Sequence, residues 1–190
     1  MIWDILIFLL IALLIFIARF LTILVHELGH AVPAMIFTRQ PVAIYIGSFG
    51  DDEGNVQFNK GLLEINIKRN PLLWRKGLCV AYDDDMNIRQ RLIQVLAGPL
   101  SSIVIAGIAV CFSVVFDLHG SIKLISGIFL FSAMFDLVLN LYPRTMQLDN
   151  YSTLDTDGKQ VLNLLRDWSY ERSMMKRKKR YPSKNNLRKI

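Results

Sequence analysis

The sequence contains little cysteine and little charge for its length. Only two of its 190 residues are cysteines, Cys79 and Cys111, and they lie too far apart to form a C-x-x-C pair. A disulfide framework and a cysteine-ligated zinc site are therefore not predicted. Charged residues make up 20% of the chain and hydrophobic residues 53%. A soluble domain has about a quarter charged residues, so this composition argues against an ordinary soluble protein and against a disordered chain.

The positive charge is confined to the C-terminal part of the chain. Residues 159–190 contain 11 Lys and Arg against 2 Asp and Glu, a net charge of +9, so the preceding residues carry −3 of the overall +6. The high pI therefore describes a tail, and we do not predict nucleic-acid binding from it. A basic cluster such as residues 176–180 instead favours contact with anionic lipid headgroups.

Three hydrophobic stretches account for the excess of apolar residues. Residues 92–116 contain no charge, whereas residues 5–25 and 124–142 each contain one, Arg19 and Asp136 respectively. A helix needs about 20 mostly apolar residues to cross a bilayer. We therefore predict an α-helical integral membrane protein with a core of three transmembrane helices. The predicted helices span about residues 2–30, 92–116 and 122–142.

The region between the first two predicted helices has a different pattern. Residues 63–68 alternate between apolar and polar side chains, as a half-buried strand does. Further candidate strands are residues 42–46, 56–58 and 77–82. We expect two or three short strands in a β-rich insertion, residues 41–82, on the cytoplasmic side. Residues 1–158 would form the membrane-embedded core, and residues 159–190 a cytoplasmic amphipathic helix with a basic tail.

The basic tail also orients the predicted helices. Segments rich in Lys and Arg stay in the cytoplasm, so the chain after the third helix is predicted to be cytoplasmic. Counting back through three spans puts residues 117–123 outside and the end of the first helix inside. We expect a multi-pass protein of a bacterial or archaeal cytoplasmic membrane.

One motif at the end of the first predicted helix has the most specific chemistry. Residues 26–30 read His-Glu-Leu-Gly-His, so His26 and His30 lie on one face of a helix and can bind one metal ion. Glu27 can reach a water molecule beside that ion without binding the ion itself. This H-E-x-x-H spacing is typical of zinc metalloproteases. Because ionisable residues in membrane helices are costly and usually functional, we predict a Zn²⁺ site here.

The two histidines need a third ligand, since a catalytic zinc takes three protein ligands and a water. His119 is unsuited, because the predicted orientation places it on the opposite side of the membrane. Three aspartates follow the third helix on the same side as the histidines: Asp149, Asp155 and Asp157. Asp157 precedes a glycine and a helical pattern, but an aspartate at such a position is also a common helix N-cap. The residue pattern alone leaves the choice open.

The two charges inside the hydrophobic stretches are predicted to pair. Arg19 lies seven residues before His26, and Asp136 lies four residues before Asn140, so each falls on the helix face of a candidate site residue. The two helices run in the same direction, which places both charges deeper in the membrane than the zinc. We predict an Arg19–Asp136 ion pair that supports the site. The alternative is that Arg19 faces a water-filled cavity or reaches the membrane surface.

These features resemble the site-2 protease family of intramembrane zinc metalloproteases. The His-Glu-Leu-Gly-His motif ends an apolar helix, and Ala-Gly-Pro-Leu at residues 97–100 opens the second. Asn-Leu-Tyr-Pro at residues 140–143 ends the third helix and is followed by Thr-Asp-Gly at residues 156–158. The resemblance covers residues 20–158, with the β-rich insertion in the expected place.

The resemblance implies roles for individual residues. It implies a zinc ion held by His26, His30 and Asp157. It also implies that Glu27 is the catalytic base and that Asn140 positions or polarises the substrate peptide. Many members place Leu-Asp-Gly soon after the Asn-x-x-Pro motif, but here Leu148-Asp149 is followed by Asn150. Asp157 is favoured because it stands in an Asp-Gly pair, and Asp149 is the second candidate for the third ligand.

The leading hypothesis is an intramembrane zinc endopeptidase that cuts a membrane-anchored protein or hydrophobic peptide, as in regulated intramembrane proteolysis. We expect the substrate to dock as a strand on an edge of the 41–82 sheet, at residues 62–68. One alternative is a non-catalytic scaffold that binds transmembrane segments, although Glu27 has no role in a scaffold. Another is a metal transport or sensor protein, which would need more ligands. The sequence does not decide whether the protein has a regulatory membrane partner or forms a homo-oligomer.

Overall fold

The structure is a computed structural model, and it describes residues 2–82, 85–147 and 153–180. Within these ranges the α-helices are α1 (Ile2–Thr38), α2 (Ile88–Val115), α3 (Gly120–Leu141) and α4 (Asp157–Arg180). Of these, α1, α2 and α3 are long and apolar enough to cross a membrane. They lie where the three hydrophobic stretches of the sequence predict helices.

The helix ends follow local signals rather than the limits of the hydrophobic stretches. α2 begins earlier than predicted because Asn87 and Gln90 form a capping box, in which each side chain accepts a hydrogen bond from the backbone N–H of the other. α1 continues beyond the His-Glu-Leu-Gly-His motif to Thr38. It ends where Arg39 adopts a left-handed φ of 56° shortly before Pro41.

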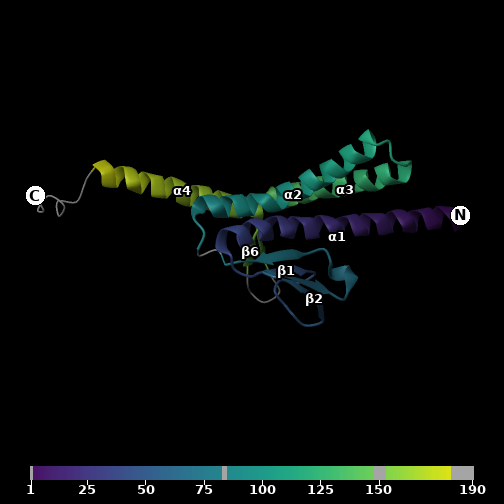
Figure 1. Ribbon diagram of the computed structural model, residues 1–190, viewed down its shortest axis with the longest axis horizontal. Helices are drawn as coiled ribbons and strands as arrows, with labels where there is room; N and C mark the ends of the chain where they lie inside the picture. Colours follow the sequence, from purple (N-terminus) through teal and green to yellow (C-terminus); the bar gives the residue numbers. More distant parts are fainter. Residues whose placement is uncertain (1, 83–84, 148–152, 181–190) are drawn as a thin grey trace, which may run out of the picture.

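α1 lies between two layers of the molecule (Figure 1). α2 and α3 form an antiparallel pair along one side of α1, and a small β-sheet packs along its other side. The N-terminus and the α2–α3 connection lie at one end of this arrangement, and α4 projects from the opposite end (Figure 1). The end of α1, the start of α2 and the end of α3 therefore meet near the start of α4.

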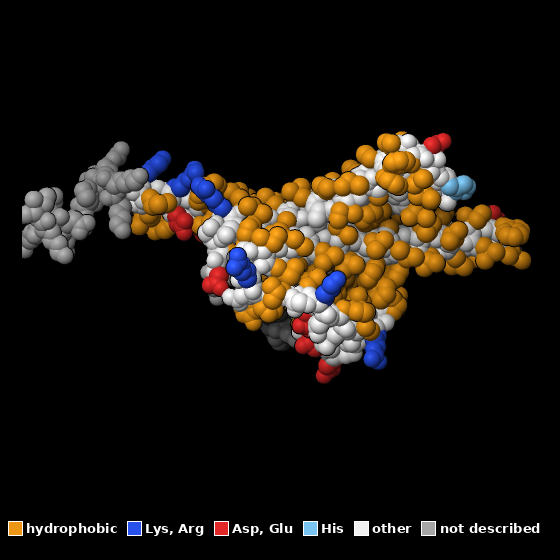
Figure 2. Space-filling model, viewed as in Figure 1, with side chains coloured by type: hydrophobic (Ala, Val, Ile, Leu, Met, Phe, Trp, Pro, Cys, Tyr) orange, Lys and Arg blue, Asp and Glu red, His pale blue; other side chains and the backbone are white. Residues whose placement is uncertain are grey.

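Hydrophobic side chains cover much of the surface of the long helices (Figure 2). The exposure is greatest over the first half of α1, where Phe8 is 71% exposed and Leu10 56% exposed. No residue from Ile2 to Ile17 is buried by the protein itself. Apolar surface of this extent is unusual on a soluble monomer and is what a lipid bilayer would cover.

The sheet contains four strands in the order β2-β3-β1-β4, more than the two or three expected. The strands are β1 (Val42–Ile46), β2 (Asn55–Lys60), β3 (Leu63–Lys68) and β4 (Gly77–Val80). β1 is parallel to β3, and the other two pairings are antiparallel. The expectation that residues 62–68 offer a docking edge is wrong, because β3 is paired on both sides. The edges of this sheet are β2 and β4.

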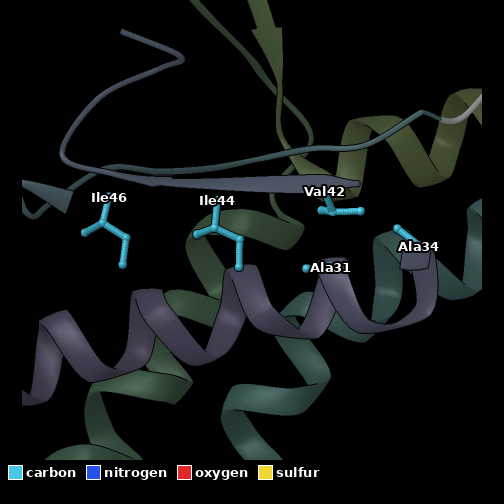
Figure 3. Close-up of a cluster of buried hydrophobic side chains, with 5 residues drawn as sticks. All are labelled: Ala31, Ala34, Val42, Ile44 and Ile46. Carbon is cyan, nitrogen blue, oxygen red and sulfur yellow. The ribbon is translucent and has the colours of Figure 1, made fainter. Parts of the chain in front are cut away.

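The sheet is attached to α1 through alternate residues of β1 (Figure 3). Val42, Ile44 and Ile46 point toward the helix and are almost completely buried, whereas the residues between them are half-buried. They pack on Ala31 and Ala34, whose small side chains let the strand approach the helix closely. This contact fixes the position of β1 along the axis of α1. The neighbouring strand β4 therefore lies beside Ile23 and Glu27 of the helix.

A second, two-stranded sheet follows α3 and is not predicted by the sequence. β5 (Thr145–Gln147) pairs antiparallel with β6 (Thr153–Asp155), and Thr145 lies opposite Asp155. Strands of three residues are too short to show a periodic pattern. The hairpin has a clear consequence for the fold, since it returns the chain to the end of α3 before α4 begins.

Candidate metal centre

The two histidines of the α1 motif lie together inside the protein. His26 and His30 are one helical turn apart, and their Nε2 atoms are 3.0 Å from each other. Both residues are less than 10% exposed. α2 makes room for them at Gly98, because a Cβ atom there would overlap the His30 imidazole. The glycine of the Ala-Gly-Pro-Leu motif thus allows the ring of a candidate ligand to fit between two helices.

Asp157 is the aspartate that the fold brings to the histidines. Its Oδ2 lies 3.1 Å from Nε2 of His26, and its Oδ1 lies 3.5 Å from Nε2 of His30. The preceding Thr156 fixes this position, because its hydroxyl donates to the carbonyl of Tyr142 and its backbone pairs with that of Arg144. The start of α4 is therefore tied to the end of α3.

The other candidates for the third ligand do not reach the histidines in the described part of the chain. Asp155 instead forms an ion pair with Lys159 and accepts a hydrogen bond from Thr145. His119 caps the start of α3, at the opposite end of that helix. Asp149 lies outside the described residues. Ligand atoms of His26, His30 and Asp157 all lie within 4.8 Å of one another.

The hydrogen-bond partners of the imidazoles determine where their protons lie. Nδ1 of His30 is 2.9 Å from the backbone carbonyl oxygen of Gln94, and a carbonyl only accepts, so this nitrogen carries the proton. Nδ1 of His26 is 2.9 Å from Oδ2 of Asp136, although the two atoms are not aligned as a regular hydrogen bond. The carboxylate favours a proton there too. Both Nε2 atoms then present lone pairs to each other and to Asp157.

This arrangement fits a divalent cation. Two lone pairs and a carboxylate that face one another in a buried space repel unless a cation lies among them. The charged groups that contact the two histidines directly are the carboxylates of Asp136 and Asp157, and the guanidinium of Arg19 pairs with Asp136, which leaves the charge of Asp157 uncompensated. Buried charge of one sign is costly unless it is compensated. The cluster can therefore hold a metal ion through two nitrogens and one carboxylate.

Glu27 lies beside the ligands rather than among them. Its side chain is buried and, with His26 and His30, lines a cavity of about 100 Å³. The first residue of β4 contacts it directly, since a Cβ atom on Gly77 would overlap the Glu27 carboxylate. Leu78 and Cys79 continue the wall of this cavity. One edge strand of the sheet therefore passes next to the carboxylate that the motif assigns as general base.

The predicted ion pair between the two helix charges is confirmed. Nη1 of Arg19 lies 2.6 Å from Oδ1 of Asp136, which is 2% exposed. The structure adds two contacts that the sequence analysis missed. Oδ2 of the same carboxylate lies beside His26, as described above, and accepts a hydrogen bond of 3.0 Å from Nδ2 of Asn140. Asp136 therefore connects Arg19, Asn140 and a candidate metal ligand.

Two ionisable groups outside the apolar helices α1, α2 and α3 have pKa values that are shifted by the surroundings of the cluster. Burial opposes ionisation of Asp157, but a positive charge shared with His26 and His30, such as a proton on Nε2, holds the pKa of this carboxyl well below its usual range. Burial raises the pKa of the Cys79 thiol, and the nearby carboxylates of Glu27 and Asp157 raise it further. Asp157 is therefore ionised and able to bind a metal, whereas Cys79 remains a neutral thiol and is a poor ligand.

The sequence contained little signal for several residues around the cluster. Gln94 contributes a backbone carbonyl, which any residue type could provide. The role of Gly77 and Leu78 depends on the order of the strands, and the hydrophobic pattern does not encode that order. Arg19 and Asp136 could be recognised from the sequence, because each is a single charge within an apolar stretch.

No protein-family model matches the chain, and no curated protein matches it at a significant level. Support for a function therefore comes from the residues of the cluster and their geometry.

Proposed function

We propose that this protein is an intramembrane zinc endopeptidase of the site-2 protease type. The observation that carries this proposal is the convergence of two imidazole lone pairs and the Asp157 carboxylate, with the buried carboxylate of Glu27 beside them. Two histidines and one carboxylate form the ligand set of several catalytic zinc sites. Because three apolar helices surround this cluster, the substrate class that fits is a membrane-anchored protein or a hydrophobic peptide.

The roles of the side chains follow from their positions. A zinc ion in this cluster would polarise the scissile carbonyl and lower the pKa of water to about 7. Glu27 accepts a proton from the attacking water and passes it to the leaving amine nitrogen. Asn140 lines the same cavity, and its amide nitrogen is held by Asp136, so its carbonyl end and its position are fixed before substrate arrives.

The sheet offers a place for the unwound substrate. A peptide bond within a helix is shielded by the helix itself, so the substrate has to become extended before it is cut. β4 pairs with β1 on one edge, and its other edge has no partner strand in the described sheet. An extended peptide that adds to this edge regains main-chain hydrogen bonds next to Glu27. The proposed docking strand is therefore β4.

The proposed topology places the metal centre toward the cytoplasmic face. α4 carries much of the basic charge and leaves the core at the end where the metal cluster lies (Figure 1). Basic segments stay cytoplasmic and are attracted to anionic headgroups, so this end faces the cytoplasm in our proposal. The N-terminus and the α2–α3 connection then lie on the other side.

Metal content and cleavage test the proposal separately. We expect the purified protein to contain zinc and to cut quenched fluorescent peptides with a hydrophobic segment. His30→Ala should lose the zinc, because one of the three ligands is missing. Glu27→Gln should keep the zinc and lose cleavage by about 100- to 10,000-fold, the usual contribution of a general base. Glu53→Gln, in an exposed loop, is the matched control. Wild-type protein without zinc, or an active Glu27→Gln variant, would contradict the proposal.

A further inference from the structure

A second cavity, of about 270 Å³, adjoins the candidate metal centre. It lies between α1, the end of α3, the start of β4 and β5, and it shares part of its lining with the first cavity. The shared residues are His26, Glu27, Gly77, Asn140 and Met146. A molecule bound at the metal centre can therefore extend into the second cavity.

Positive charge dominates the second cavity. Its basic lining residues are Arg19, Arg75, Lys76 and Arg144, and its acidic ones are Glu27 and Asp136. Arg19 is neutralised by its ion pair with Asp136. In the part of the chain that the structure describes, no carboxylate forms an ion pair with Arg75, Lys76 or Arg144. Three uncompensated cations beside one carboxylate create a local field that attracts an anion.

The cations lie in line with the proposed docking strand. Arg75 and Lys76 directly precede Gly77, the residue that contacts Glu27. A strand rises about 3.3 Å per residue, so a peptide added to β4 passes these side chains within about three residues of the bond to be cut. Lys76 is held in place over the ring of Phe49, with its Nζ 4.9 Å from the ring centroid. Arg144 approaches the same space from the segment after α3.

From this geometry we propose that the second cavity is a subsite for a carboxylate of the substrate peptide. The substrate carries Asp, Glu or a free C-terminus within about three residues of the scissile bond, and the cations of Arg75, Lys76 and Arg144 bind it. This inference rests on the proposed function, and it adds the chemical class of one substrate residue. A lipid phosphate is the competing occupant. It fits less well because the cavity shares His26 and Glu27 with the metal centre, where the proposed substrate binds.

Binding to an inactive enzyme tests the subsite without requiring cleavage. The probe is a fluorescent peptide with a leucine–alanine membrane segment followed by an extended segment that contains glutamates, compared with the same peptide containing glutamines. Full-length Glu27→Gln protein in nanodiscs of neutral lipid should bind the glutamate peptide about tenfold more tightly, the sum of several partly exposed ion pairs. The Arg75→Gln/Lys76→Gln variant should lose this preference, and Arg144→Gln, on a separate segment, should reduce it.

Lys60→Gln provides the matched control, because Lys60 lies in β2 at the other edge of the sheet. It should keep the full preference for glutamate. Equal binding of the two peptides would overturn the subsite, as would variants that lose only their affinity for anionic lipid vesicles, which would assign the cations to lipid phosphate. A retained glutamate preference in a protein that has no zinc and no cleavage activity would support the subsite and reject the proposed protease.

Discussion

The two halves of α1 belong to one continuous helix but have opposite surroundings. In residues 2–17 no side chain is buried, and large apolar side chains face outward on all sides. Residues 18–34 pack against α2, α3 and the sheet, and they contain all the buried polar residues of the helix. Apart from Asp4 in the first turn, the first half has no charged residue.

The difference shows that polar side chains occur in this apolar helix where neighbouring residues provide hydrogen-bond or ion-pair partners. Arg19 has Asp136 as its partner, and the Thr22 hydroxyl donates to the backbone carbonyl of Ala18. The imidazole of His30 likewise has a partner on a neighbouring helix, the backbone carbonyl of Gln94. In the first half a polar group would face lipid, where an unsatisfied group costs several kcal/mol. Buried polar residues of α1 therefore occur only in the half that other elements enclose.

The largest expected effect comes from closing the space around the second half. Gly98→Ala adds a methyl group that overlaps the His30 imidazole, so we expect the variant to lose its zinc during dialysis and to show no cleavage. Gly107→Ala is the control in the same helix, because no atom lies within 4 Å of its added Cβ. It should keep zinc and activity. Normal zinc content in Gly98→Ala would mean that α1 and α2 are not packed as described.

Removing one partner of the buried ion pair should have the next largest effect. Arg19→Leu leaves the Asp136 carboxylate without its cation, so we expect the free energy of unfolding to fall by about 3 kcal/mol. The double variant Arg19→Leu/Asp136→Leu should recover much of that loss, as measured by denaturation in detergent. It should not recover zinc affinity, because Asp136 no longer contacts His26. A double variant no more stable than Arg19→Leu would argue against the pairing.

A smaller effect is expected when the contact of Asp136 with the candidate ligand is weakened. Asp136→Asn keeps the shape but removes the charge that orients His26, so zinc affinity should fall by about 10- to 100-fold in a competition titration with a chelator. Asp117→Asn, in the connection between α2 and α3, serves as the control. Equal affinity in wild type and Asp136→Asn would show that the carboxylate does not act on His26.

The same conservative substitution in each half should give the smallest effect. Ile23 is 4% exposed, and Ile23→Val removes a methylene from a packed site, at a cost of about 1 kcal/mol. Ile15 is 54% exposed, and Ile15→Val should change stability by less than about 0.5 kcal/mol. Parallel detergent denaturation measures both. Equal losses would show that protein also covers the first half, for example through a second copy of the chain.

The sequence predicted the parts of the molecule that depend on spacing along a helix. The four-residue separation of His26 and His30 places them together in any α-helix. The pairing of Arg19 with Asp136 followed from their depth and direction in two parallel helices. Such predictions need only the helical repeat and the length of each stretch.

Features that depend on strand order or on atomic contacts could not be predicted. Nothing in the pattern of residues 63–68 shows that this strand is central and that β4 is an edge. The contact of Asp136 with His26 depends on the exact rotation of α3 about its axis. The sequence pattern shows only which face of the helix Asp136 occupies, so it cannot give this rotation. The residue pattern alone left the third ligand open, because the position of Asp157 depends on the β5–β6 hairpin, whose strands are too short to recognise; only the resemblance favoured Asp157.

Because of that hairpin, the start of α4 and the end of α3 are close in space although they are separated along the chain. The two strands of the hairpin hold Thr145 opposite Asp155, and the Thr156 hydroxyl donates to the carbonyl of Tyr142, so Asp157 lies beside the end of α3. A change that breaks the pairing of β5 with β6 would therefore move Asp157 away from His26 and His30.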